Sequence, residues 1–368
     1  MIFHVVSVSG GKDSAATLLM AIARFGRARV VAIFCDTGNE HAEVYAYLDY
    51  LEQALDIKIV RLRANFDREI AAKRMFIARD ARTRREYDTA PVFDADGNPV
   101  PKRDGRGNII TRTIRRNGEQ VVEPVQKTRK IGGGRRVRWS NKAKRRALEV
   151  LAPTGIPFLD LCLWKGRFPS RLAQFCTEEL KRNVAVTYQL ELADAGYTVV
   201  SWQGVRRAES LARRDAKKFE RIAPSIYIFR PLVEWTAGQV FDYCRSFGIQ
   251  PNPLYKQGMG RVGCMPCINV GKDELRQIAA RFPDYIEVKA RWETLVSRAS
   301  KRGHSTFFHK IDESGRAIDS AIFARNNIWK TVEWSRTSRG GRQFDMLADL
   351  IEPTACASAY GLCDQGEA

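Results

Sequence analysis

The 368-residue chain contains only four histidines, fewer acidic residues than basic ones, and no long apolar run. No segment approaches the roughly 18 apolar residues that a membrane-crossing helix needs. The first residues form an apolar, strand-like run instead of a secretory signal, and no internal repeat is evident. The composition is 44% apolar and 28% charged, which is typical of globular proteins. We therefore expect a cytoplasmic protein that does not bind a membrane.

Cysteine is more frequent than histidine, with eight residues. In a cytoplasmic protein these thiols do not predict structural disulfides. They indicate a metal site, an iron–sulfur cluster or thiol chemistry. The eight are Cys35, Cys162, Cys176, Cys244, Cys264, Cys267, Cys356 and Cys363.

The excess of positive charge is concentrated in one segment. Residues 79–146 contain 20 lysines and arginines but 8 aspartates and glutamates, while the whole chain has a net charge of +19. Turn signals at residues 94–98, 104–108 and 117–118 predict β-hairpins. A basic segment of this kind commonly meets phosphate. We therefore predict a basic β-hairpin insertion whose residues 79–146 contact DNA or tRNA, the alternative being a solvated surface loop.

Strands and helices alternate in the first 65 residues. Apolar β-type runs at residues 2–8, 29–34 and 57–62 enclose helical patterns at 13–25 and 40–55. A helix at 177–195 and a strand at 197–202 extend this order after the insertion. Such alternation predicts an α/β fold with a parallel sheet. We divide the chain into the N-terminal half of this domain (1–79), the insertion (80–150), the remainder of the domain (151–270) and a helical C-terminal region with a cysteine tail (271–368).

The sequence Ser9-Gly10-Gly11-Lys12-Asp13-Ser14 links the first predicted strand to the first predicted helix. In this setting backbone N–H groups and the helix N-terminus face an anion, and glycine lets the backbone approach it closely. Lys12 adds a cation, and the two serines add hydroxyl donors. The spacing is not that of the eight-residue Walker loop. We predict a phosphate-binding loop.

Two further loops follow predicted strands, where ligands of such sheets bind. One contains Asp36-Thr37-Gly38, whose carboxylate and amides could contact a nucleotide or Mg²⁺. The other contains Gly204, Arg206 and Arg207. Arginine suits bidentate binding of phosphate or sulfate.

These motifs together resemble a known family. The loop at residues 9–14 resembles the SGGxDS pyrophosphate loop of the PP-loop ATP pyrophosphatases. Five further segments resemble motifs of the phosphoadenosine phosphosulfate reductase family within that superfamily, and they lie at residues 36–38, 175–181, 204–210, 230–236 and 252–267. The resemblance covers about residues 1–65 and 155–275. It implies an adenine-nucleotide α-hydrolase-like, Rossmann-type sheet.

The resemblance also implies roles for individual residues. ATP or phosphoadenosine phosphosulfate would be the nucleotide, with Mg²⁺ held by Asp13 or Asp36 if it is ATP. The predicted nucleotide-binding residues are Ser9, Gly10, Gly11, Lys12, Asp13, Ser14, Asp36, Thr37, Gly38, Lys181, Gly204 and Arg206. The predicted catalytic residues are Lys12, Asp13, Arg206, Arg207, Cys176 and Cys363.

The pair Cys264-x-x-Cys267 has the spacing of half a tetrahedral zinc or iron–sulfur site. Cys356 and Cys363 are our first choice for the other half, and Cys176 with one more ligand is the alternative; the spacing does not separate Zn²⁺ from [4Fe–4S]. Cluster-bearing reductases of the family have Cys-Cys where this chain has Cys176 followed by threonine. Their nucleophilic Glu-Cys-Gly-[Ile/Leu]-His tail is also absent, and Cys363 would be a displaced nucleophile.

Three hypotheses follow. The first is ATP cleavage between the α and β phosphates, with adenylylation linked to sulfur transfer onto a nucleic acid, as related DNA-phosphorothioation ATPases and tRNA thiolases suggest. A thiol or sulfur-donor protein would be a partner. The second is a thiol-dependent phosphoadenosine or adenosine phosphosulfate reductase. The third is a nucleic-acid-binding module that retains a nucleotide site as a switch, which binding without turnover would indicate.

Overall fold

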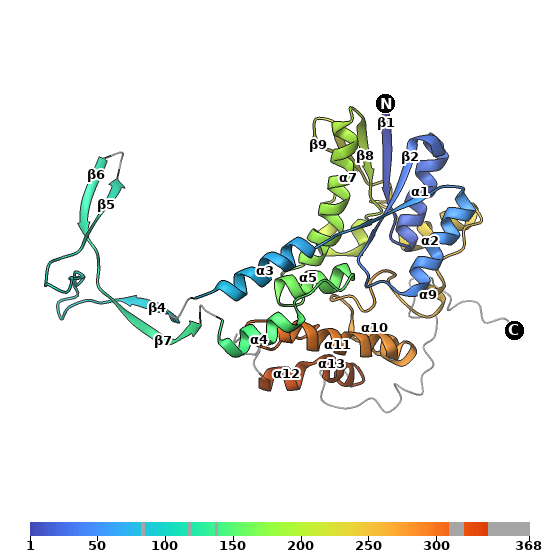
Figure 1. Ribbon diagram of the computed structural model, residues 1–368. Coiled ribbons are helices and arrows are strands. Elements are labelled where there is room, and N and C mark those ends of the chain that lie inside the picture. The colour runs from blue at the N-terminus through green and yellow to red at the C-terminus, as the bar shows by residue number, and fades with distance from the viewer. Residues whose placement is uncertain (82–84, 117–118, 137–138, 309–319, 338–368) are drawn as a thin grey trace. The chain divides into compact units, whose positions relative to one another are not determined.

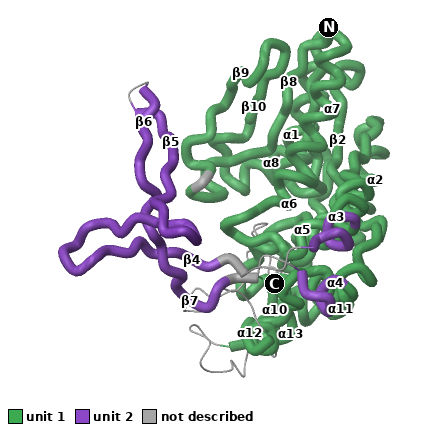
Figure 2. Tube along the Cα trace, turned by 60° about the vertical axis from the view of Figure 1, so that its left-hand side comes forward, with its two compact units in different colours: residues 1–74, 145–368 green, residues 75–144 purple. Residues whose placement is uncertain are grey.

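The computed structural model describes residues 1–81, 85–116, 119–136, 139–308 and 320–337 (Figure 1). The chain forms two compact units (Figure 2). The first unit consists of residues 1–74 and 145–368, and the second of residues 75–144. The division of the first unit near residue 270 stays a prediction.

A six-stranded sheet forms the centre of the first unit. Its strand order is β3-β2-β1-β8-β10-β9, and β9 alone runs antiparallel to its neighbour. The bounds are β1 Ile2–Ser7, β2 Val30–Asp36, β3 Ile59–Arg63, β8 Thr198–Trp202, β9 Phe219–Ala223 and β10 Ile226–Phe229. The predicted α/β class and parallel order are confirmed. The sequence analysis missed β9, an edge strand whose Phe219 and Ile222 are exposed.

Helices cover both faces of this sheet (Figure 1). On one face Val5, Ile33, Val199 and Ile226 pack against helix α7 (Asn183–Asp194). Helix α1 (Lys12–Phe25) packs on β1 and β2, and it also contacts α8 (Ala237–Ser246). Helix α2 (Ala42–Leu55) follows β2. No helix among the described residues is long and apolar enough to span a membrane.

The strand order places a crevice beside β1. The chain continues from β1 to β2 on one side, whereas β8 lies on the other side. In open α/β sheets this reversal of strand order is where ligands bind, beyond the carboxyl ends of the strands. The loops that follow β1 and β8 therefore meet at the expected position of a site.

The predicted helix at residues 177–195 is interrupted. The short helix α6 (Phe175–Thr177) leads into one π-helical turn at Glu178–Arg182, and α7 follows. Single π turns inside helices frequently occur at functional sites. This turn contains Lys181 and Arg182. Two other short helices, α5 (Pro157–Lys165) and α9 (Pro253–Lys256), begin with proline at their first position.

The described C-terminal region is helical, as expected. Helices α10 (Lys272–Arg281), α11 (Pro283–Ala299) and α13 (Ile328–Ser335) pack on one another, and α12 (Ser320–Asn326) contacts α13. Pro283 separates α10 from α11, because it occupies the first turn of α11, where its missing N–H is not needed.

A buried carboxyl group joins these helices. Glu293 of α11 is 2% exposed. Its Oε1 accepts from the Phe307 N–H at 2.7 Å, and its Oε2 accepts from the Ile328 N–H at 3.0 Å. Burial raises the pKa of Glu293 to about 7, although both backbone donors oppose the shift.

We expect Glu293→Gln to lower the free energy of unfolding at pH 5 by about 1–3 kcal/mol, because the amide nitrogen cannot accept from the second buried N–H. The native pKa is raised, so the folded state holds a proton that the unfolded state releases between about pH 4.5 and 7. Stability therefore decreases with rising pH in this window, and the variant should show a flatter profile. Urea unfolding across this range tests both effects, and an unchanged profile would contradict the assignment.

The second unit consists mainly of antiparallel ribbons. Strand β4 (Arg85–Pro91) pairs with β7 (Thr128–Arg136), and β5 (Thr111–Arg116) pairs with β6 (Glu119–Pro124). Helices α3 (Asp67–Arg79) and α4 (Asn141–Val150) include its ends. The predicted β-hairpin insertion is present in the fold.

Candidate nucleotide-binding site

The loop at residues 9–14 connects β1 to α1, and hydrogen bonds between its own residues fix its conformation. Ser14 Oγ accepts from the Ser9 N–H at 3.0 Å and donates to the Gly11 carbonyl at 2.9 Å. Gly10 has φ +74°, and a Cβ there would lie 2.9 Å from Val44 Cγ1. The loop thus requires glycine and presents the N-terminus of α1, which favours an anion.

Asn252 and Tyr255, from the motif at residues 252–267, support this loop through hydrogen bonds. Tyr255 Oη accepts from the Lys12 N–H at 3.1 Å, and Asn252 Nδ2 donates to the Gly10 carbonyl at 3.2 Å. Tyr255 is 2% exposed and Asn252 is 1% exposed. The motif therefore supports the loop, a role that the sequence analysis did not assign.

Asp13 lies between two buried cations. Its Oδ1 accepts from Arg206 Nε at 2.5 Å, and its Oδ2 lies 3.2 Å from Lys12 Nζ. Lys12 and Arg206 are 8% and 6% exposed. Burial lowers the pKa of Lys12 and Arg206 acts in the same direction, whereas Asp13 opposes the shift. One carboxylate thus balances two cations.

Two further arginines increase the positive charge of this site. Burial lowers the pKa of Arg213, and the neighbouring cations Arg261 and Arg206 add to the effect. Arg213 forms an ion pair with Glu209. Glu274 lies beside Arg261, so in this part of the described structure four cations face three carboxylates, Asp13, Glu209 and Glu274. Such crowding of like charges is relieved by an anionic ligand.

A cavity of about 700 Å³ opens at this position. Its volume is within the usual range for small-molecule sites. Its lining combines cationic side chains with apolar side chains of β2, α7 and β10. The cationic lining residues are Lys12, Lys181, Arg182, Arg213, Arg230 and Arg261, and the apolar ones include Ile33, Phe34, Ala185, Val186 and Ile228. This arrangement suits a ligand with a polyanionic group and an apolar, flat group.

The cavity brings together about half of the predicted nucleotide-binding residues. Those that line it are Ser9, Gly11, Lys12, Asp13, Ser14, Lys181 and Gly204. Gly10, Asp36, Thr37, Gly38 and Arg206 are not part of the lining. Arg206 instead lies behind Asp13, which it contacts. Its effect on a bound anion would pass through that carboxylate.

Gly204 makes the closest approach of the β8 loop to α1. A Cβ at this position would lie 2.8 Å from the carbonyl carbon and oxygen of Asp13 and 3.1 Å from the Ser14 nitrogen. The adjacent Arg207, which we predicted to be catalytic, is outside the cavity lining. Its Nη2 and Nε donate to the Ala216 carbonyl at 3.0 and 3.2 Å. These two hydrogen bonds stabilise the loop and keep the Arg207 side chain away from the cavity lining.

The carboxylate of Asp36 already has partners. Its Oδ1 accepts from the Gly38 N–H at 2.9 Å and from Tyr45 Oη at 2.8 Å, and its Oδ2 lies 3.3 Å from Arg63 Nε. Asp13 is also paired with two cations. The donor set therefore does not fit the expected Mg²⁺ site, and we derive no step through this ion.

Glu40, which lines the cavity, links the β2 loop to the Cys264–Cys267 loop. Its carboxylate accepts from the Thr37 hydroxyl at 2.7 Å, and Cys264 Sγ lies 3.5 Å from Oε1. Lys181 Nζ lies 3.8 Å from the same sulfur. The Lys181 side chain thus reaches from the π turn to this loop.

The cysteine site is only partly within the described structure. Cys176 and Cys267 are close enough that Cys267 contributes to raising the pKa of Cys176, after burial. Among the described residues, no three histidine, cysteine or acidic side chains are arranged to hold a metal ion. Cys356 and Cys363 lie outside the described residues. The zinc or [4Fe–4S] site stays a prediction, and we derive no step through it.

Cys35 is the described cysteine that lines the cavity, and burial raises the pKa of its thiol to about 11. Because the thiolate is the reactive form, we expect Cys35 at pH 8 to react with iodoacetamide on the order of a hundredfold more slowly than free cysteine. Peptide mass spectrometry after timed labelling gives the rate, and labelling in urea is the control. Reaction at the rate of free cysteine would contradict this environment.

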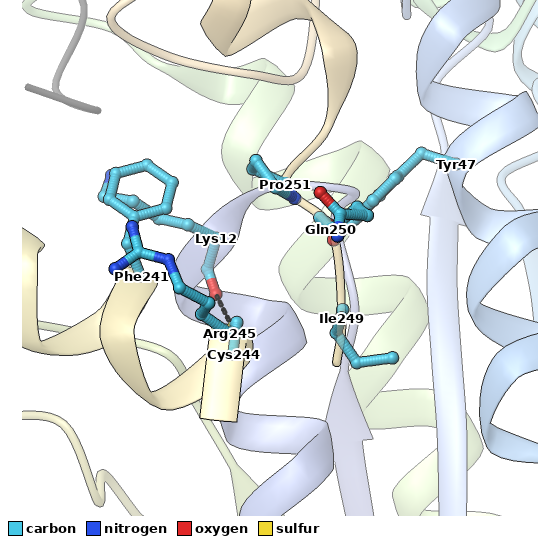
Figure 3. A pocket seen from close by; sticks show the side chains of 8 residues that line it. All are labelled: Lys12, Tyr47, Phe241, Cys244, Arg245, Ile249, Gln250 and Pro251. Atoms are coloured by element: carbon cyan, nitrogen blue, oxygen red, sulfur yellow. Dashed lines mark hydrogen bonds between the residues drawn. The ribbon is translucent and has the colours of Figure 1, made fainter. Parts of the chain in front are cut away.

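Lys12 also lines a second, smaller cavity of about 150 Å³ (Figure 3). It is lined by Lys12, Tyr47, Phe241, Cys244, Arg245, Ile249, Gln250 and Pro251. The Lys12 ammonium lies 5.7 Å from the centre of the Phe241 ring and 5.4 Å from that of Tyr255. The aromatic rings thus hold this lysine in its buried position.

Sequence reasoning missed several residues near the site. Glu40, Arg213 and Arg261 lie in segments that contain predicted motifs, but their side chains were given no role. Lys289 gave no sequence signal. It is 2% exposed, and burial lowers its pKa to about 7, while Cys264 and Glu40 oppose the shift.

The fold and the site define an α/β protein with an anion-binding cavity at the carboxyl edge of its sheet. The chain matches the phosphoadenosine phosphosulfate reductase domain over residues 3–88 and 162–270. It belongs to that family, and the expected relationship is confirmed.

Individual relatives cover different parts of the chain. A 37.8 kDa protein encoded in the gpa 5′ region of Escherichia phage 186, described as uncharacterized, is 39% identical over 372 residues, which are 98% of this chain and 96% of that protein. An adenosine 5′-phosphosulfate reductase of Burkholderia cepacia is 36% identical over 86 residues, which are 22% of this chain and 33% of the reductase.

Among solved structures, the phosphoadenylyl-sulfate reductase of Candida auris in complex with phosphate gives a TM-score of 0.33 at 13% identity, and the match covers 72% of this chain and 80% of that chain. This structural similarity is too low to carry an argument about the site.

Proposed function

We propose that the protein is an enzyme that cleaves ATP between the α and β phosphates and adenylylates an acceptor as part of sulfur transfer, with a nucleic acid as the acceptor. The observation that carries the proposal is the group of four cations around Asp13 beside the loop at residues 9–14. An adenine nucleotide supplies both a polyanion for the cationic side chains of the cavity and a flat base for its apolar side chains.

The residues of the cavity would act through position and charge. Backbone N–H groups of the 9–14 loop would bind the phosphates, and Lys12, Arg213 and Arg261 would offset the charge that develops on the phosphate oxygens. Lys181 also lines the cavity. Neighbouring thiol and carboxyl groups raise the pKa of Lys181, so it carries a positive charge at neutral pH. Asp13 holds Lys12 and Arg206 in place.

A phosphosulfate reductase needs an attacking thiolate, and the raised pKa of Cys35 makes this cavity-lining thiol a poor candidate for that role. The alternative, a thiol-dependent reductase, is favoured by the 86-residue similarity to the Burkholderia cepacia enzyme. Its nucleophile would be Cys176, which is outside the cavity lining, or Cys363, which lies outside the described residues.

Two reaction products, pyrophosphate and sulfite, distinguish ATP cleavage from phosphosulfate reduction. Protein purified without oxygen is incubated with ATP and Mg²⁺, and separately with phosphoadenosine phosphosulfate and a dithiol, and pyrophosphate and sulfite are measured. The proposal predicts pyrophosphate without sulfite, and Cys363→Ser should leave its release unchanged. Sulfite that Cys363→Ser abolishes would establish the reductase. Nucleotide binding without either product, in the presence of candidate acceptors, would indicate a binding module.

A further inference from the structure

The second unit contains a ten-residue repeat that the sequence analysis did not detect. Residues 92–101 and 102–111 share Asp, Gly and Asn at corresponding positions, in the segments Asp94–Asn98 and Asp104–Asn108. In each copy the Asp N–H donates to the Asn carbonyl at 2.9 Å, and the Asp Oδ1 accepts from the Asn N–H at 2.8 or 2.9 Å. Three shared residues in ten are too few to stand out by sequence alone.

One strand segment joins the two copies with equivalent hydrogen bonds. Lys127 donates its N–H to Val100 and accepts from Val92, while Val125 donates to Ile110 and accepts from Lys102. Between them Gln126 pairs with Pro101. Two small hairpins and the ribbons β4–β7 and β5–β6 therefore meet in a four-armed module, defined here as the described residues 85–116 and 119–136.

Two carboxylates of this module are used by its own turns, whereas most of its described basic side chains have no described ion pair. Asp94 and Asp104 accept backbone N–H groups inside their turns. In the described part of the module, Arg112 forms an ion pair with Glu123. The exposed basic side chains without a described ion pair are Lys102, Arg103, Arg106, Arg115, Arg116, Lys127, Arg129 and Lys130.

Register places three of these cations together. Pro101 lies opposite Gln126, so Lys102 and Lys127 project from the same face of their paired strands, and Arg129 follows two residues later. Exposed lysines and arginines on one face of a ribbon are the arrangement that contacts a phosphate backbone. The cations and the ribbon geometry thus indicate a nucleic-acid surface.

The module has few aromatic side chains on which unpaired bases could stack. Single-strand binding uses aromatic platforms, and residues 85–136 contain only Tyr87 and Phe93 as aromatic residues. Lys130 Nζ lies over the Tyr87 ring at 4.8 Å, which leaves Phe93, 53% exposed. The major groove of B-form DNA admits a two-stranded ribbon, whereas that of an RNA duplex is too narrow for side chains to read.

We propose that the four-armed module binds duplex DNA through its phosphate backbone, with Lys102, Lys127 and Arg129 as principal contacts. This inference deepens the proposed function by narrowing the acceptor from a nucleic acid to duplex DNA. It concerns binding alone, so it is tested without nucleotide, and its failure would leave the pyrophosphate result unaffected.

The test measures fluorescence anisotropy of the full chain with a short duplex DNA, the same single strand and the corresponding RNA duplex. We expect the duplex DNA to bind most tightly, with an affinity that decreases steeply as salt rises from about 50 to 200 mM. The triple variant Lys102→Ala, Lys127→Ala, Arg129→Ala should lower the slope of log affinity against log salt by roughly two to three.

The matched control removes the same charge from exposed positions of the first unit, as Lys58→Ala, Arg68→Ala, Arg291→Ala. The control should bind DNA like the unchanged protein, and circular dichroism should show both variants folded. Equal effects of the two triple variants would overturn the proposal. So would tighter binding of the single strand or the RNA duplex, or the absence of DNA binding at about 50 mM salt.

Discussion

Replacement of Asp13 by asparagine is expected to lower the free energy of unfolding by about 3 kcal/mol, because it leaves two buried cations without their counter-charge. Lys12 and Arg206 both contact this carboxylate and are both less than a tenth exposed. The substitution preserves the shape of the side chain, so the loss reports the charge. Urea unfolding measures it.

An added anion distinguishes this account from ordinary packing damage. ATP or inorganic pyrophosphate should stabilise Asp13→Asn more than the unchanged protein, since the ligand supplies the missing negative charge. Asp242→Asn is the control: Asp242 forms an exposed ion pair with Arg245, and its loss should change stability by less than about 1 kcal/mol. An Asp13→Asn protein as stable as this control would contradict the electrostatic role.

Replacement of Gly204 by alanine is expected to weaken nucleotide binding at least about tenfold, or about 1.4 kcal/mol. The added methyl group would lie 2.8 Å from backbone atoms of Asp13, which cannot move without displacing the start of α1. The loop at residues 9–14 would then no longer present its N–H groups in the same direction. Isothermal titration with ATP measures the change.

Gly260 offers a matched control, because it lines the same cavity and a Cβ there has no atom within 4 Å. Gly260→Ala should leave the affinity within about twofold of the unchanged protein, which is less than about 0.5 kcal/mol. Equal affinities of the Gly204→Ala and Gly260→Ala proteins would show that the β8 loop does not position the phosphate-binding loop.

The central sheet could be predicted from the sequence because its strands are local, buried and separated by amphipathic helices. The runs at residues 2–8, 29–34 and 57–62 became β1, β2 and β3 with shifts of one or two residues. The edge strand β9 could not be found in this way, because two of its three apolar side chains, Phe219 and Ile222, are exposed and its pairing with β10 is a tertiary effect.

The site was predictable where function depends on the backbone. Gly10 of the 9–14 loop has a positive φ and Gly204 a close approach to Asp13, and both exclude a side chain, so such constraints appear directly as glycine in a motif. The direction in which a side chain points cannot be predicted from a motif in the same way. Arg206 and Arg207 are neighbours in the same motif, yet one contacts Asp13 and the other the Ala216 carbonyl.

Long-range pairings account for what the sequence did not reveal. Glu40 meets Cys264 because the β2 loop and the 264–267 loop pair across more than 200 residues. Lys181 reaches the same place through a π turn that shifts the direction of its side chain. The repeat in the second unit is defined by hydrogen bonds to Val125 and Lys127, which lie outside both copies.

The most direct test of the central claim compares the binding of ATP and adenosine to the unchanged protein and to Lys12→Ala by isothermal titration. The account predicts that ATP binds more tightly than adenosine by at least about a hundredfold, or about 2.7 kcal/mol, and that Lys12→Ala removes most of this difference. Equal affinities for ATP and adenosine, or an ATP affinity that Lys12→Ala leaves unchanged, would contradict phosphate recognition at the 9–14 loop.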